Sequence, residues 1–323
     1  MKALAPKPGL NPKAQTPTAP GGSSRLRIGS VTDHLLAATV PLLQADAATR
    51  IAHIRSPRWI GYPAAQSAHE AMRQLLERPK SLRPRGLLLT GAYHNGKTMI
   101  IERFAIEHLR KADRQQVWVI QTREGAGMAH FYASILAGLR APEAAGWRNL
   151  PRASEQLDHL LEALQPRMLI FDEFHSALRG RQQDVKAIFS FLRRIAREHD
   201  ISPVLVGEVA VYDAVHDTEE MGSRFDTIPV PRWSYDEDFA VLLDSLEASI
   251  PLPEPSGLSR EPMARAIHGL SEGLIGEIVE IVTRAALAAI SCGEKKITAR
   301  TLKALRYVPV SQRRNAAFRE EMM

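Results

Sequence analysis

The residues with the clearest chemical meaning form one glycine-bearing loop, Gly91-Ala92-Tyr93-His94-Asn95-Gly96-Lys97-Thr98. It matches the pattern G-x-x-x-x-G-K-[ST] and lies directly between an apolar run and an amphipathic segment. Glycines let the backbone wrap closely around phosphate oxygens, and the loop N–H groups and the helix start supply partial positive charge. Lys97 adds a full charge and Thr98 a hydroxyl for Mg²⁺. The pattern predicts that these eight residues bind ATP with Mg²⁺, with His94 a variable position and not a catalyst.

Two adjacent carboxylates, Asp172 and Glu173, end the apolar run Met168–Phe171 about 75 residues after Lys97. Ionised carboxylates at the end of a buried strand are costly unless they meet a cation or water. We expect Asp172 to orient Mg²⁺ and its waters and Glu173 to polarise an attacking water as general base. This pair favours nucleotide hydrolysis over a small-molecule kinase. The alternative for Glu173 is an ordinary carboxylate at a helix start.

Apolar runs alternate with helical patterns through the middle of the chain. Because the runs are apolar throughout and are separated by helices, they predict a parallel sheet covered on both faces. We expect strands at residues 86–90, 116–120, 168–171, 203–207 and 227–230, with helices at about 64–78, 97–111, 128–139, 153–164 and 183–198. After Trp233 only helices are expected, at about 235–248, 260–268, 274–290 and 298–305.

These patterns predict an α/β fold, a P-loop core followed by a small helical lid. The expected organisation is a disordered, basic, Pro- and Gly-rich arm (1–30), an N-terminal helical segment (31–80), the α/β core (81–233), the helical lid (234–308) and a basic tail (309–323).

Composition and charge narrow the class of protein. The 323 residues are 45% hydrophobic and 24% charged, which is typical of a globular protein. No uncharged apolar run approaches the ~20 residues of a membrane span, and a single cysteine, Cys292, argues against disulfides. We therefore expect a cytoplasmic protein.

The net charge of +6 arises at the two ends of the chain. Residues 1–32 hold five basic and no acidic residues, and residues 295–323 hold eight basic and two acidic ones. Such ends attract polyanions or serve as solvated tails.

The sequence resembles the AAA+ ATPases and, within them, the TniB/TnsC-like transposition regulators of bacteria. Besides the phosphate loop and the acidic pair, the resemblance rests on five segments within about residues 50–290: Arg58-Trp59-Ile60-Gly61-Tyr62-Pro63, Leu169–His175, Leu192–Gly207, Ser223-Arg224-Phe225 and Gly273–Ile278. It implies an ATP-dependent homo-oligomer, a hexameric ring or a helical filament, on double-stranded DNA. The implied partners are a DDE-type transposase and a TniQ-like protein.

The resemblance also implies roles for single residues. An arginine at the place of Arg224 reaches the γ-phosphate held by a neighbouring subunit, although a surface salt bridge is the plainer interpretation. Tyr62 is expected to line the adenine pocket, with core packing as the alternative. Two positions depart from the general AAA+ pattern: Glu208 stands after the fourth strand where Asn or Thr is common, and Gly276 stands where many relatives have a nucleotide-contacting arginine. Both predict slow, regulatory hydrolysis.

Four basic residues in the predicted loops are candidates for DNA contact: Arg123 after the second strand, and Arg179, Arg181 and Lys186 after the acidic pair. Contacts of this kind reach the phosphate backbone and are independent of base sequence. Solvated helix ends explain the same charges.

Competing functions remain open. A helicase loader of the DnaC or IstB kind shares the nucleotide motifs. An origin-binding ATPase is disfavoured because only about 30 residues follow the lid segment that resembles the family, which ends near residue 290. A signalling or scaffold ATPase that binds only protein would show no nucleotide-dependent association with DNA.

Overall fold

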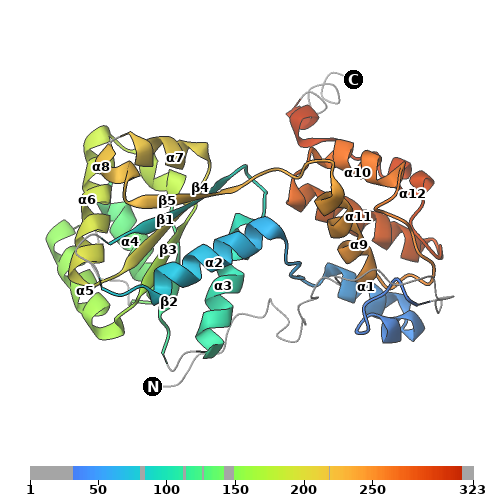
Figure 1. Ribbon diagram of the computed structural model, residues 1–323, viewed down its shortest axis with the longest axis horizontal. Coiled ribbons are helices and arrows are strands. Elements are labelled where there is room, and N and C mark those ends of the chain that lie inside the picture. The colour runs from blue at the N-terminus through green and yellow to red at the C-terminus, as the bar shows by residue number, and fades with distance from the viewer. Residues whose placement is uncertain are drawn as a thin grey trace. The chain divides into compact units, whose positions relative to one another are not determined.

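Five parallel strands form the centre of the α/β part of the chain (Figure 1). The computed structural model describes residues 32–80, 84–111, 114–125, 127–141, 149–217 and 219–314. The predicted arm (1–30) and most of the predicted tail (309–323) lie outside these residues. The strands lie in the order β2-β3-β4-β1-β5, and each neighbouring pair is parallel. Their bounds are β1 Gly86–Gly91, β2 Val117–Gln121, β3 Met168–Asp172, β4 Ser202–Gly207 and β5 Phe225–Val230.

The central strands are buried on both faces, as their uniformly apolar sequences predict. Every residue of β3 and β4 is buried. In the register, Leu88 of β1 lies opposite Leu205 of β4, and Ile170 of β3 lies opposite Val204. The predicted parallel sheet is therefore confirmed.

Helices cover both faces of this sheet. Residues of α4, α5 and α6 pack with Leu88, Trp118 and Phe171 in one apolar cluster, whereas α2 and α3 contact each other and β1. The bounds are α2 Pro63–Glu77, α3 Lys97–Lys111, α4 Met128–Gly138, α5 Leu150–Leu164, η2 (a 3₁₀-helix) Phe174–Arg179, α6 Gln182–Glu198, α7 Val209–His216 and α8 Glu219–Gly222.

The strand order places three important segments at one edge of the sheet. Strand β4 lies between β3 and β1, so the carboxyl ends of all three are neighbours. The phosphate loop follows β1, the acidic pair ends β3, and Glu208 follows β4. In open α/β sheets this edge is where ligands bind.

The remaining described residues form a separate helical unit. The described residues divide into two compact units: those from Pro63 to Pro231 form the α/β unit, and those before Pro63 or after Pro231 form the helical unit. The helical unit contains η1 (a 3₁₀-helix) Val40–Gln44, α1 Ala47–Arg55, α9 Glu237–Ala248, α10 Met263–Ser271, α11 Ile275–Ser291 and α12 Ala299–Ala304. Apolar residues of α1 and α9–α12, such as Ile54, Leu243 and Ile281, form its core.

Two arginines fasten the N-terminal segment of the helical unit to the end of α9. Arg58 donates to the carbonyl and hydroxyl oxygens of Ser249 at 2.9 and 2.6 Å, and Arg50 donates to the carbonyl of Pro251. A buried carboxylate, Glu247, accepts from the backbone N–H groups of the following turn, residues 256–258. The bonds of Arg50 and Arg58 explain why segments far apart in sequence belong to one unit.

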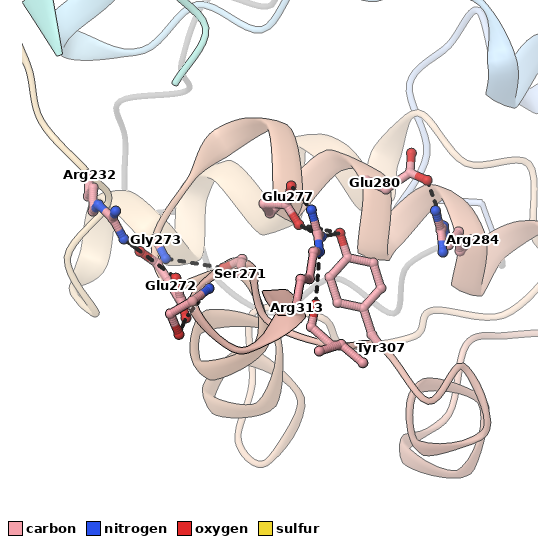
Figure 2. Close-up of polar contacts among 11 residues, drawn as sticks. Arg232, Ser271, Glu272, Gly273, Glu277, Glu280, Arg284, Tyr307 and Arg313 are labelled. Atoms are coloured by element: carbon pink, nitrogen blue, oxygen red, sulfur yellow. Dashed lines mark hydrogen bonds and ion pairs between the residues drawn. The ribbon is translucent and has the colours of Figure 1, made fainter. Parts of the chain in front are cut away.

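A polar cluster around Glu277 joins the first turn of α11 to the segment after α12 (Figure 2). Glu277 is 3% exposed. Its carboxylate accepts a 2.5 Å hydrogen bond from the Tyr307 hydroxyl and forms an ion pair with Arg313. The guanidinium groups of Arg284 and Arg313 each lie over the Tyr307 ring. A buried carboxylate with this many partners is satisfied, so the cluster holds the C-terminal segment on α11.

Candidate nucleotide-binding site

The phosphate loop has the backbone geometry that its glycines predict. Gly96 has φ 81°, a left-handed conformation in which a side chain is strained, and His94 adopts φ 59°. A Cβ atom at Gly91 would lie 2.5 Å from the carbonyl oxygen of Val230 in β5. The loop therefore requires glycine at both fixed positions. Tyr93 is 70% exposed and stacks on His94.

Lys97 begins α3 and lies at the centre of the site. It is 7% exposed, and its ammonium group donates to the carbonyl oxygens of Gly91 and Ala92 at 3.0 and 2.7 Å. Burial lowers the pKa of Lys97, while the carboxylates of Glu173, Glu208 and Asp172 act in the opposite direction. The charged form of this buried cation is therefore favoured by three carboxylates that stand at the ends of β3 and β4.

Thr98 and Asp172, the two predicted metal ligands, lie in direct contact. The Thr98 hydroxyl donates to one carboxylate oxygen of Asp172 at 2.8 Å. The other Asp172 oxygen accepts from the backbone N–H of Glu173 at 2.9 Å, and Asp172 is 1% exposed. Hydroxyl and carboxylate oxygens are the ligands that Mg²⁺ prefers, and Mg²⁺ bound with phosphates uses few protein ligands. The donor set fits the metal that the sequence predicts.

Glu173, the predicted general base, follows β3 with a left-handed backbone, φ 51°. Such a conformation at a residue other than glycine costs about 1 kcal/mol or more and is often found at functional sites. It turns the chain sharply from β3 into η2, with Glu173 immediately before the first residue of η2. One Glu173 carboxylate oxygen lies 3.2 Å from Nδ1 of His175.

Glu208 stands immediately before α7 and makes no side-chain capping bond there. It follows β4, whose carboxyl end lies between those of β3 and β1, and its carboxylate favours the charged form of Lys97. The structure thus brings Lys97, Thr98, Asp172, Glu173 and Glu208 together around the phosphate loop.

Asn95 has a structural partner that its place in the motif did not predict. Its side-chain amide donates to the carbonyl oxygens of Val230 and Pro231, both at 2.8 Å, and the residue is 2% exposed. The phosphate loop is therefore tied to the carboxyl end of β5.

Arg224 lies just before β5 and is engaged within the chain. Its guanidinium is 3.7 Å from the Glu220 carboxylate, which also accepts from Arg193 at 2.5 Å. The salt bridge considered from the sequence is present, and a role for Arg224 in a neighbouring subunit remains a prediction.

Two further predicted site residues belong to the helical unit. Tyr62 is 8% exposed, and its ring lies 5.2 Å from that of Trp233. Burial raises the pKa of Tyr62 to about 12. Gly276 is the second residue of α11 and precedes the Glu277 cluster. Core packing of Tyr62 is observed, and nucleotide contacts of both residues remain predictions.

The four predicted DNA-contacting residues are exposed and lie in the α/β unit. The loop of Arg123 touches the end of η2, because Arg179, the last residue of η2, lies 3.8 Å from Glu124. A Cβ atom at Gly180 would lie 3.4 Å from the Gly127 nitrogen. Arg181 stands immediately before α6, and Lys186 lies in its second turn. Arg123 therefore lies on a loop that adjoins the segment from the end of η2 to the start of α6, which carries Arg179 and Arg181.

The sheet order, the phosphate loop after β1 and the acidic pair after β3 together define the AAA+ class of P-loop proteins. Solved structures share this fold. Cdc6p from Pyrobaculum aerophilum is 18% identical, with 76% of this chain and 67% of that chain covered and a TM-score of 0.52. The Aeropyrum pernix ORC2 protein, solved as ADPNP-ADP complexes, is 15% identical, with 74% and 66% covered and a TM-score of 0.55. Drosophila ORC bound to DNA is 13% identical, with 89% and 69% covered and a TM-score of 0.52.

The chain spans about two thirds of the length of these structures. At such identities the likeness shows the fold alone. No curated protein sequence matches the chain significantly.

The family of this protein is shown by a match of its sequence to a family model. The family model described as bacterial TniB protein matches residues 50–235, more than half of the chain. The protein therefore belongs to the TniB family. No helix among the described residues is long and apolar enough to cross a membrane.

Proposed function

We propose that the protein is an ATPase that regulates DNA transposition. In this proposal it assembles as a homo-oligomer on duplex DNA in the ATP-bound state, and slow hydrolysis releases it. Its partners are a DDE-type transposase, which it recruits or activates, and a TniQ-like protein. The observation that carries the ATPase part is the contact of Thr98 with Asp172, next to Lys97 and Glu173. Membership of the TniB family supports the link to transposition.

The chemistry of the site follows from its residues. Lys97 and the loop N–H groups would bind the phosphates, and Thr98 and Asp172 would hold Mg²⁺, whose chemistry there would be to neutralise charge on the phosphate oxygens. Glu173 accepts a proton from the attacking water, which needs a carboxylate within reach of that water. Glu208 places a further negative charge near Lys97, and this charge opposes the approach of the γ-phosphate. Slow turnover suits a switch that ATP binding sets and hydrolysis resets.

The proposed DNA contacts rest on charge placement. Arg123, Arg179 and Arg181 are exposed and lie on two adjoining segments, and an oligomer presents this group once per subunit. Contacts of this kind bind the DNA backbone with little dependence on sequence.

Electron microscopy of the protein with duplex DNA, with and without a non-hydrolysable ATP analogue, tests this proposal. We expect ordered oligomers on DNA only when the analogue is present. The Glu173→Gln variant should form the same oligomers with ATP itself and retain them, because binding is intact and proton transfer is lost. Its hydrolysis rate should fall by about 100-fold or more.

Three outcomes would contradict parts of the proposal. Absence of ATP-dependent oligomers on DNA would remove the transposition role. Hydrolysis at the wild-type rate in Glu173→Gln would show that Glu173 is not the base. ATP-dependent association with a protein partner and not with DNA would instead support a scaffold ATPase.

A further inference from the structure

His175 lies beside the proposed general base on a firmly anchored element. It is the second residue of η2, two positions after Glu173. Its neighbours Phe174, Ser176 and Ala177 are buried, at 0%, 4% and 2% exposure. The Phe174 ring packs among those of Phe131, Phe171 and Phe189. The backbone around His175 is therefore held by the core of the α/β unit.

The imidazole faces the Glu173 carboxylate. Nδ1 of His175 lies 3.2 Å from Oε2 of Glu173, with the two side chains 21% and 30% exposed. This Nδ1 atom is buried, and within the described residues it makes no hydrogen bond of regular geometry. Buried nitrogen atoms of this kind need a polar partner. The Glu173 oxygen is the acceptor that lies beside it.

We propose that His175 is a positioning residue that orients the Glu173 carboxylate toward the attacking water. The proposal rests on the proposed ATPase function. With Nδ1 protonated, the imidazole holds Oε2 and leaves Oε1 to accept the proton from water. A base held in place by a third group is a recurring arrangement in catalysis, and misplacement of a base by about 1 Å lowers rates by as much as 100-fold.

The strained turn at Glu173 makes such support necessary. The backbone of Glu173 is left-handed, and this conformation sets the direction in which its side chain leaves the chain. A strained conformation of this kind persists only when surrounding contacts stabilise it. The Asp172 carboxylate accepts from the Glu173 backbone N–H, and the imidazole of His175 lies 3.2 Å from the end of the Glu173 side chain. In this proposal the two groups fix both ends of Glu173.

Steady-state ATP hydrolysis and separate ATP-affinity measurements on the full chain test this role. We expect His175→Leu to lower kcat by about 10-fold or more with ATP affinity unchanged, because His175 acts on the base and not on the phosphates. His175→Asn places an amide N–H near the position of Nδ1 and should keep kcat within about 3-fold of wild type. His175→Gln, whose amide lies one bond further out, should not. His216→Leu, at an exposed histidine of α7, is the matched control and should hydrolyse normally.

A double-substitution series separates orientation of the base from a purely structural effect. In the Glu173→Gln background, His175→Leu should change kcat by less than about 2-fold, because residues that act as a unit are not additive. Equal losses in both backgrounds, a rise in kcat for His175→Leu, or equal rates for the Asn and Gln variants would overturn the proposal.

Failure of the proposed ATPase function can be distinguished from failure of the role of His175 alone. If the wild-type protein binds ATP but does not hydrolyse it, or if Glu173→Gln hydrolyses at the wild-type rate, both the ATPase mechanism and the role of His175 are lost. If Glu173→Gln is inactive and only the His175 variants are normal, the ATPase mechanism stands and this inference alone fails.

Discussion

At the scale of single residues, Lys97 is the buried cation of the candidate site. It donates to two loop carbonyls, and three nearby carboxylates favour its charged form. Burial disfavours its charge, whereas the carboxylates and the phosphates of a bound nucleotide favour it. The residue is therefore prepared to bind phosphate at little additional desolvation cost.

Lys97→Ala should weaken ATP binding by about 10- to 100-fold. Hydrogen bonds to charged groups contribute about 1.5–3 kcal/mol, and each 1.4 kcal/mol is about tenfold in affinity. Isothermal titration calorimetry measures this change. Lys186→Ala, at an exposed lysine of α6, is the control and should bind ATP normally. Unchanged affinity in Lys97→Ala would contradict the assignment of the loop.

Tyr62 should make the free energy of unfolding depend on pH in the alkaline range. Burial raises its pKa from 10.0 to about 12 in the folded state, so the folded protein keeps the phenolic proton where the unfolded chain loses it. The resulting stabilisation is complete below about pH 10 and is lost as pH rises through about 12. Tyr62→Phe should show a smaller fall in the free energy of unfolding between pH 8 and pH 11, measured by urea denaturation at each pH.

The same variant tests how the Tyr62 hydroxyl is buried. That oxygen has no hydrogen-bond partner among the described residues, so at pH 8 Tyr62→Phe should be neutral or slightly stabilising. Tyr93→Phe, at a tyrosine that is 70% exposed, should leave the pH profile unchanged. A loss of stability at pH 8 would indicate a polar contact of the Tyr62 hydroxyl.

At the scale of elements, Asn95 connects the phosphate loop to β5 through both amide hydrogens. Asn95→Asp has the same size but presents a carboxylate to two carbonyl oxygens. It should destabilise the α/β unit by about 2–4 kcal/mol, since a buried unpaired charge is costly. Hydrogen exchange of the β5 amides reports this change. Tyr93→Ala in the same loop should cost less than about 0.5 kcal/mol, and equal protection in both variants would show that the Asn95 bonds contribute little.

Most elements of the fold were predictable because their signals are local. Strands such as β3 and β4 are apolar at nearly every position and buried at every one, and Gly96 marks a left-handed position whatever the rest of the chain does. Strand order was not predictable in this way, because it depends on contacts between residues far apart in sequence. The short helices α7 and α8 also lacked a clear periodic signal.

The candidate site was predictable to the same extent. The phosphate loop has a fixed internal pattern, and the two carboxylates of the acidic pair are adjacent at the end of an apolar run, so each could be recognised locally. The folded sheet then brings Thr98 into contact with Asp172. The bonds of Asn95 to β5 and the approach of His175 to Glu173 depend on side-chain conformations in the folded protein. The pattern Asp172-Glu173-Phe174-His175 was visible, but nothing in its spacing showed that the imidazole turns toward Glu173.

At the scale of the whole molecule, the distribution of charge limits how DNA can be held. Residues 1–32 and 295–323 carry more positive charge than the whole protein, so residues 33–294 are net acidic. DNA binding therefore comes from a few arginines of the α/β unit that an oligomer repeats, or from the basic ends of the chain. Each arginine–phosphate contact contributes about 0.9 to the slope of log affinity against log salt concentration.

Salt titrations with ATP analogue present distinguish these two sources of DNA affinity. The Arg179→Ala/Arg181→Ala double variant should lower the magnitude of the slope by about 2 per subunit and leave ATP affinity unchanged, because both side chains lie outside the phosphate loop. The control, Arg265→Ala/Arg284→Ala, removes the same charge from exposed, glutamate-paired arginines of the helical unit. If both double variants change the slope equally, general surface charge explains the binding. If only deletion of residues 1–24 changes it, the N-terminal arm and not the loops holds the DNA.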